Sequence, residues 1–211
     1  MNKLKLITLI LLTFCFQSCI EGVKEMKSWI DASSIDVVQG QYHNLSDDGI
    51  KVFLPSVFNK YSTEEYKAIV KNILPITEYK AETKRLEILR KLEGSFTIFY
   101  DEVTRSTSTL NTLPYQPIFK RDAQYLLGMI RMNYEKNNDD SDIVYTKVTA
   151  KYNADSGPQI FKAVFKIESI ANKTAIYNFT YIISVNEKTV WIQLQSPYEN
   201  GVDDYLNKLI M

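Results

Sequence analysis

Side chains capable of chemistry are few in this chain and are scattered along it. The only histidine, His43, lies in a polar stretch with neither a cysteine partner nor a serine motif nearby. A Ser-His-Asp triad or a zinc site built on histidine is therefore not expected. Carboxylate chemistry stays open, because Glu168 and Glu187 fall near the edges of predicted strands and two converging acids can hydrolyse a glycosidic bond. Solvated surface is the simpler interpretation of both.

Metal, phosphate and nucleic-acid sites are not indicated either. Acidic runs at 47–48 and 139–142 offer oxygen ligands, but neither has the spacing of an EF-hand, and turn residues are the favoured interpretation. None of the seven glycines is spaced as in a phosphate-binding loop. Basic and acidic residues number 25 each, which argues against a general nucleic-acid binder. We therefore expect no metal, no cofactor and no nucleic-acid partner.

The two cysteines carry the most specific signal. Lys3 and Lys5 precede an uncharged, apolar run from 6 to 16. Its length suits a secretory signal of about 7–15 residues and is too short for a membrane span of about 20. The run ends in Phe16-Gln17-Ser18-Cys19, which resembles the lipobox of bacterial lipoproteins. The resemblance implies that the peptide before Cys19 is removed and that Cys19 is acylated.

This resemblance predicts where the protein resides. Two or more acyl chains hold a protein stably on a bilayer, so we expect a lipid-anchored protein of the bacterial cell envelope. The outer membrane is favoured over the inner one, with the domain facing the periplasm or the cell surface. A plain secreted protein and an uncleaved anchor are the alternatives. Losing residues 1–18 removes two lysines and no acid, which changes the formal charge from zero to −2. The lysine-rich composition resembles that of many Bacteroidota.

The periodicity of apolar residues predicts the elements of the mature chain. Strands are expected at 50–54 and 95–101, and then at 142–153, 161–167, 175–184 and 190–195. Helices are expected behind a capping box at Ser62-Thr63-Glu64-Glu65, over 78–92 and over 120–136, with a short last helix that Asp203 caps. In the lead-in, 23–30 is a candidate short helix.

Four successive strands joined by short turns predict an antiparallel meander with one buried face. The amphipathic helices are the only elements available to cover that face, so the fold class is α+β. We expect residues 1–18 to be a signal peptide, 19–48 a lipid anchor and tether, and 49–211 one α+β domain.

A second resemblance concerns this domain. The segment Gly49-Ile50-Lys51-Val52-Phe53-Leu54-Pro55, the long meander and the closing helix near Asp203 are similar to PsbP-like and DcrB-like domains. Phe58 stands near the place where that superfamily has a tryptophan, and two helices between the first two strands are more than it usually has. The resemblance implies a non-enzymatic accessory or binding domain.

The segment 102–119 is the candidate for partner binding. It is rich in threonine and serine, and we expect a long loop there, which in a compact domain is often functional. Its apolar residues are the candidate contacts: Leu110, Leu113, Tyr115 and Phe119, with Ile118 beside them. A loop folded inward over the edge of the sheet is the alternative.

The sequence leaves three functions open. The favoured one is a membrane-anchored, non-catalytic binding or accessory lipoprotein with an unknown protein or small-molecule partner. The second is an immunity or chaperone-like lipoprotein that binds a toxin or a secretion component. The third is a hydrolase that uses carboxylates on the meander.

Overall fold

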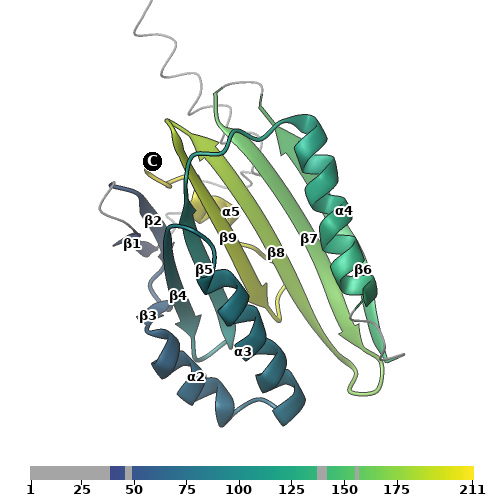
Figure 1. Ribbon diagram of the computed structural model, residues 1–211. Helices are drawn as coiled ribbons and strands as arrows, with labels where there is room; N and C mark the ends of the chain where they lie inside the picture. The colour runs from purple at the N-terminus through teal and green to yellow at the C-terminus, as the bar shows by residue number, and fades with distance from the viewer. Residues whose placement is uncertain (1–38, 46–48, 137–141, 155–156) are drawn as a thin grey trace, which may run out of the picture.

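A computed structural model describes residues 39–45, 49–136, 142–154 and 157–211. A seven-stranded antiparallel sheet forms the centre, in the strand order β3-β4-β5-β9-β8-β7-β6 (Figure 1). Its strands are β3 (Asn59–Tyr61), β4 (Ser95–Asp101), β5 (Ser106–Leu113), β6 (Ile143–Asn153), β7 (Gln159–Ser169), β8 (Thr174–Val185) and β9 (Lys188–Ser196). The predicted α+β class is confirmed.

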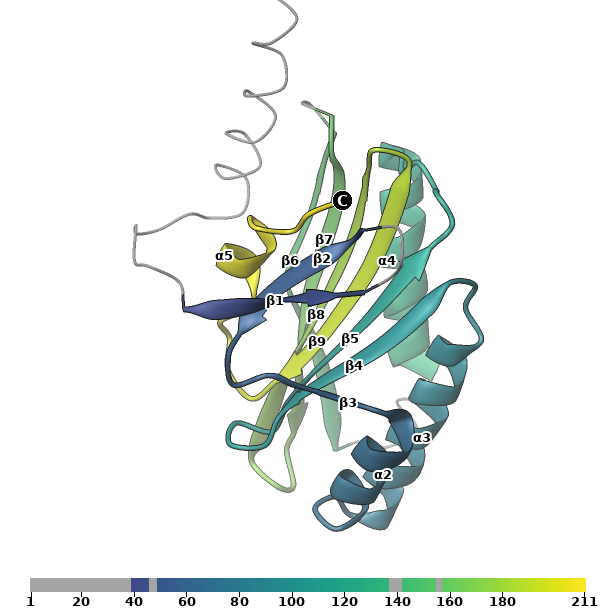
Figure 2. The same ribbon diagram turned by 90° about the vertical axis from the view of Figure 1, so that its left-hand side faces the viewer.

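Elements cover both faces of this sheet, as the rotated view shows (Figure 2). One face carries the helices α2 (Thr63–Lys71), α3 (Ile76–Arg90) and α4 (Lys120–Lys136). The other carries a separate two-stranded ribbon of β1 (Gly40–Asn44) and β2 (Lys51–Pro55), together with the short α5 (Asp203–Leu206). The protein therefore has three layers.

The predicted meander is confirmed, but the prediction of one buried face is wrong. β6, β7, β8 and β9 pair in succession, and β8 turns into β9 through Asn186 and Glu187, both with positive φ, as in a type I′ hairpin. On β7, Phe161 packs towards α4, whereas the neighbouring Ile160 packs on the opposite face under the β1–β2 ribbon. The apolar row of β7 therefore faces α4, whereas the apolar rows of β8 and β9 belong to the core under the ribbon, and treating all three rows as one face missed the second core.

The expectation of a loop over the whole of 102–119 is also wrong, because eight of these 18 residues form a strand. Ser106–Leu113 forms β5, a central strand between β4 and β9. Threonine is β-branched and suits a strand, and most polar side chains of β5 form hydrogen bonds within the protein, although the buried Ser108 hydroxyl has no partner. The Ser106 hydroxyl donates to Ser196, and the Asn111 amide donates to the Leu89 carbonyl.

Local sequence signals determine where α2 begins and how the chain enters β4. At α2 the Ser62 hydroxyl accepts from the Glu65 backbone amide while the Glu65 carboxylate accepts from the Ser62 amide, so the capping box is confirmed. Gly94, ahead of β4, has φ +101°. A Cβ at this position would lie 1.7 Å from the Thr112 carbonyl oxygen, so only glycine fits.

Two regions near the chain ends differ from expectation. Gly40–Asn44, expected in the tether, pairs with β2 as strand β1, so ordered structure begins before the expected domain boundary at residue 49. Val202, and not Asp203, is the N-cap residue of α5. The Asp203 carboxylate instead accepts a hydrogen bond from the buried Lys162 at 2.8 Å, which ties α5 to β7.

Two glycine substitutions with opposite outcomes test this backbone. Gly128 lies in α4, and a Cβ there would meet no atom within 4 Å, so Gly128→Ala should stabilise the fold by about 0.5–1 kcal/mol. Gly94→Ala should destabilise it by about 1–3 kcal/mol, because φ is positive and the Thr112 carbonyl is in the way. Urea unfolding measures both; equal effects would contradict the assigned backbone.

Candidate functional site

The candidate site lies around helices α2 and α3. Their inner sides pack on the β4 end of the sheet, where Tyr66, Val70 and Leu86 contact Ile98 and Tyr100. The capping box fixes where α2 starts, directly after β3. The N-terminus of α2 and the C-terminal end of α3 thereby come to lie on either side of β4.

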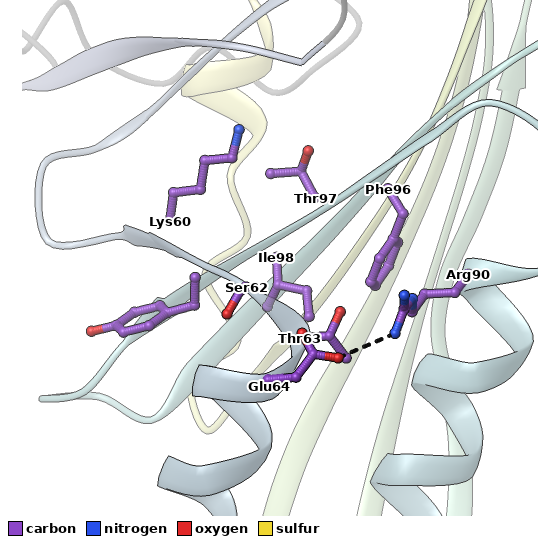
Figure 3. Close-up of a pocket in the computed structure, with 9 residues that line it drawn as sticks. Lys60, Ser62, Thr63, Glu64, Arg90, Phe96, Thr97 and Ile98 are labelled. Carbon is purple, nitrogen blue, oxygen red and sulfur yellow. Dashed lines mark ion pairs between the residues drawn. The ribbon is translucent and has the colours of Figure 1, made fainter.

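An open pocket of about 470 Å³ lies between β3, the start of α2, the end of α3 and β4 (Figure 3). Phe96 and Ile98 of β4 give it an apolar wall, and Lys60, Glu64 and Arg90 bring charge. The Arg90 guanidinium lies 3.5 Å from the Glu64 carboxylate across the opening, and both side chains are at least half exposed.

This arrangement suits reversible binding of a small group that is partly apolar and partly anionic. An exposed ion pair such as Arg90–Glu64 contributes about 0–1 kcal/mol, so a ligand anion can displace Glu64 from Arg90 at little cost. Lys60 also lines the pocket, but its amine points away from Arg90 towards the β1–β2 ribbon, where its charge lowers the pKa of His43 (Figure 3). A ligand that contacts the Phe96 ring would add apolar burial to these charge interactions.

Ser62, which also lines the pocket, belongs to the cap of α2. Ser62 Oγ donates to Glu65 Oε2 at 2.7 Å, while the Ser62 backbone amide donates to the same oxygen at 2.9 Å. These hydrogen bonds hold the pKa of Glu65 below its usual value. Because a low pKa makes a poor base at neutral pH, this Ser–Glu pair is a structural cap.

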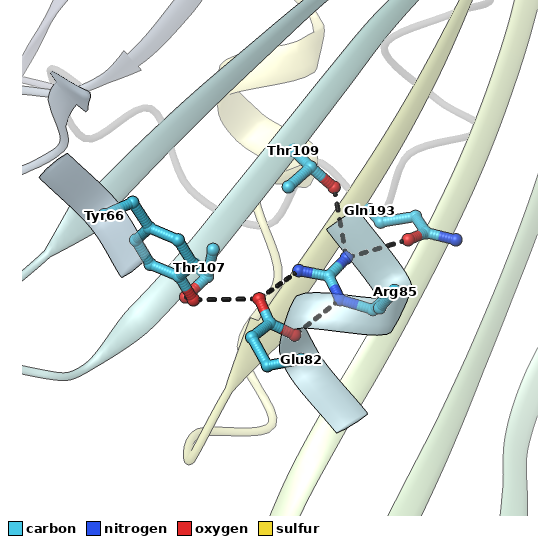
Figure 4. Close-up of polar contacts among 6 residues, drawn as sticks. All are labelled: Tyr66, Glu82, Arg85, Thr107, Thr109 and Gln193. Atoms are coloured by element: carbon cyan, nitrogen blue, oxygen red, sulfur yellow. Dashed lines mark hydrogen bonds and ion pairs between the residues drawn. The ribbon is translucent and has the colours of Figure 1, made fainter. Parts of the chain in front are cut away.

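A buried polar network joins α2 and α3 to the centre of the sheet (Figure 4). Arg85 donates to both carboxylate oxygens of Glu82 at 2.7 Å and to Gln193 of β9 at 3.0 Å. Tyr66 donates to Glu82 at 3.0 Å and lies 2.9 Å from the Thr107 hydroxyl of β5. The network therefore spans both helices and two neighbouring strands.

The pKa shifts in this network agree with its geometry. Burial raises the pKa of the Tyr66 hydroxyl well above its usual value, and the Glu82 charge raises it further. Burial also pushes the pKa of Glu82 upward, but the charge and hydrogen bonds of Arg85 and the hydrogen bond from Tyr66 outweigh it, so the net shift is downward. Glu82 therefore stays ionised beside Arg85, and the pair anchors α3 on the sheet.

The residues of the expected partner loop separate into buried and exposed groups. Leu110 is 1% exposed in β5 and belongs to the core under the β1–β2 ribbon, so it contacts no outside partner. Leu113 ends β5 and is half-buried. Tyr115 and Phe119 are 47% and 50% exposed in the segment before α4. Cys19 and its flank Phe16-Gln17-Ser18 lie outside the described residues, as do 47–48 and most of 139–142.

Other candidates for chemistry are also far from the pocket or engaged. His43 is half-buried on β1, with its ring edge against Phe99, and burial followed by the nearby Lys60 charge lowers its pKa. Glu168 pairs with Lys166 at 2.7 Å opposite the start of β8, whereas Glu187 sits in the turn after β8. The two acids therefore lie at opposite ends of β8 and do not converge.

Sequence reasoning missed the network, although a signal was present. Tyr79, Leu86 and Leu89 form the apolar stripe of α3, and Glu82 falls within the same stripe. An acid on a core-facing stripe indicates a buried partner, and Arg85 one turn later is that partner. Arg90 had no comparable signal, because only the fold brings it beside Glu64 and Phe96.

Comparisons with known proteins give a likeness of structure. No protein-family model and no curated protein sequence matches the chain. Among solved structures, the chain is similar to the solution structure of cyanobacterial PsbP (CyanoP) from Synechocystis sp. PCC 6803. The TM-score is 0.48 and the sequence identity 9%, over 83% of this chain and 89% of that chain. A likeness at this level supports no inference about function.

Metal-binding groups and membrane-spanning helices are both absent from the described residues. Within the described ranges, no group of three or more His, Cys, Asp or Glu side chains is arranged to hold a metal ion. In the same ranges, no helix has both the length and the apolar character needed to cross a membrane.

The Glu82–Arg85 pair gives a stability that depends on pH. The pKa of Glu82 in the folded protein lies below the ordinary 4.5, so its contribution is present above pH 4.5 and is lost as pH falls through the folded value. Glu82→Gln should cost about 3 kcal/mol at pH 7, because Arg85 loses its buried counter-charge. Urea unfolding from pH 7 to pH 3 should show the gap to the wild type shrinking. Glu87→Gln, on an exposed position of α3, is the control; a constant gap would contradict the ionised pair.

Proposed function

We propose that the protein is a lipid-anchored, non-catalytic binding or accessory protein of the bacterial cell envelope. The observation that carries the proposal is Phe16-Gln17-Ser18-Cys19 at the end of an apolar run of signal-peptide length. Acylated Cys19 attaches the mature chain to the outer membrane, and the α+β domain extends into the periplasm or to the cell surface. The domain belongs, in this proposal, with the PsbP-like accessory domains that it resembles.

The pocket beside β3 supports the binding role. It is open to solvent, it combines the Arg90 cation with an apolar wall, and the Arg90–Glu64 ion pair is exposed and readily exchanged. These are properties of a site that takes up and releases a ligand without altering it. We assign to it a small molecule, or a side chain of a protein partner, that carries an anionic group.

The placement of the reactive groups supports a role without catalysis. Ser62 serves the capping box, Glu82 is paired with Arg85, and Lys162 is paired with Asp203. The Lys162–Asp203 pair joins β7 to α5, and the Glu82–Arg85 pair is hydrogen-bonded to Tyr66 of α2 and Gln193 of β9. A group held in this way stabilises structure, whereas a catalytic acid or base is poised to exchange a proton with a substrate.

The anchor can be tested with one substitution and a matched control. Cys19→Ser should move the protein from the membrane fraction to the soluble fraction, whereas Cys15→Ser, within the segment that is removed, should leave it on the membrane. Mass spectrometry of the wild-type N-terminus should show acylated Cys19 as the first residue. A mature chain that begins at Met1, or an unmodified Cys19, would refute the anchor.

The binding role can be tested by capture from intact membranes with the full lipidated protein. Arg90→Glu should reduce the recovered partner or ligand at least tenfold, because an anion would then face negative charge from both Glu64 and position 90. The control is Lys84→Glu, on the exposed side of α3. Equal recovery with both variants would exclude the pocket as the binding site.

A further inference from the structure

Helix α4 differs from α2 and α3 in what its outer side presents. Its inner side is apolar, as expected: Ala123, Leu126, Leu127 and Ile130 pack against Phe161 and Phe165 of β7 and the neighbouring strands. This contact fixes the orientation of the helix on the sheet. The side that faces away from the sheet is therefore well defined.

That outer side is also apolar. Tyr125, Met129 and Met132 are 68%, 45% and 55% exposed, and their spacing of four and three residues places them in one row along the helix. Phe119, 50% exposed, lies just ahead of the helix. We call Phe119, Tyr125, Met129 and Met132 the α4 stripe. No described part of the chain covers these side chains, which is unusual for a large apolar group in water.

Positive charge accompanies the α4 stripe. The Arg121 guanidinium lies 5.7 Å from the centre of the Phe119 ring, and Lys120 and Arg131 are exposed on the same helix. The one acid in the first turn, Asp122, accepts a hydrogen bond from the Phe119 amide at 2.8 Å and so serves the start of the helix. Aromatic and methionine side chains edged by Arg and Lys are typical of helices that lie in a membrane interface.

We infer that the α4 stripe rests on the lipid surface, as a second membrane contact besides the anchor. The inference depends on the proposed lipid at Cys19. About 20 residues separate Cys19 from β1, and even fully extended they span at most about 70 Å, so the domain stays beside the bilayer. The tether gives the domain a high effective concentration at the bilayer, so a weak contact is sufficient to hold α4 against the lipid surface. A single helix of 17 residues, convex and about 25 Å long, fits a flat surface better than it fits a groove.

The test uses the full lipidated protein with one reporter thiol. Met129→Cys is reconstituted into vesicles of phosphatidylethanolamine and phosphatidylglycerol and labelled with a membrane-impermeant maleimide. For protein on the outer leaflet, labelling should be about tenfold slower than for the unlipidated Cys19→Ser, Met129→Cys chain in buffer. A tenfold decrease is expected when nine-tenths of the lipidated population is docked on the membrane. Adding Tyr125→Gln and Met132→Gln should restore fast labelling.

The matched control is Ile88→Cys, because Ile88 is 55% exposed on α3 and lies outside the α4 stripe. Its labelling rate should not depend on lipid. Three results would overturn the inference: equal labelling at position 129 with and without lipid; slow labelling in buffer, which would mean that the chain covers its own stripe; and slow labelling only in native membranes, which would point to a protein partner. Mass spectrometry of Cys19 before reconstitution separates failure of the anchor from failure of this contact.

Discussion

The pairing of β5 with β9 is the interaction on which the rest of the structure depends. β3, β4 and β5 form one half of the sheet with α2 and α3, and β6 to β9 form the other half with α4. Only the β5–β9 register joins the two halves among the described strands, from Thr107 opposite Gln195 to Leu113 opposite Thr189. The β1–β2 ribbon and α5 pack on side chains from both halves of the sheet. Neither half would therefore have both of its faces covered on its own. The pocket, the network and α4 are all positioned by this seam.

The seam is polar where a central sheet is normally apolar. On its helical face, Thr107 and Thr109 lie beside Gln195 and Gln193, and Arg85 reaches across from α3 to Thr109 and Gln193. A buried ion pair such as Glu82–Arg85 adds little net stability compared with apolar packing, but removing one partner is costly. Such a network therefore favours one register. A slip of β5 by one residue would turn Thr107 and Thr109 to the opposite face, and Tyr66 and Arg85 would each lose a hydrogen-bond partner.

What the sequence could predict followed from local signals. The capping box at Ser62, the period-two alternation of β6 to β9 and the stripe of α4 each depend on neighbours along the chain, and all three are confirmed. β5 was missed because serine and threonine resemble loop residues until their distant partners are known. Asp203 was assigned to a cap for the same reason: its partner Lys162 lies far away in sequence. The pocket is formed by β3, α2, α3 and β4, and no local sequence pattern indicates it.

The position of β9 in the sequence also constrains the order of folding. β9 ends at Ser196, close to the C-terminus, yet it lies in the middle of the sheet between β5 and β8. As the chain is synthesised, the α2–α3 half is complete long before its pairing strand exists, and its polar edge at β5 has no partner until then. Long-range pairing of this kind is slow, because the intervening loop must close first. The finished sheet therefore forms only when nearly the whole chain has been synthesised.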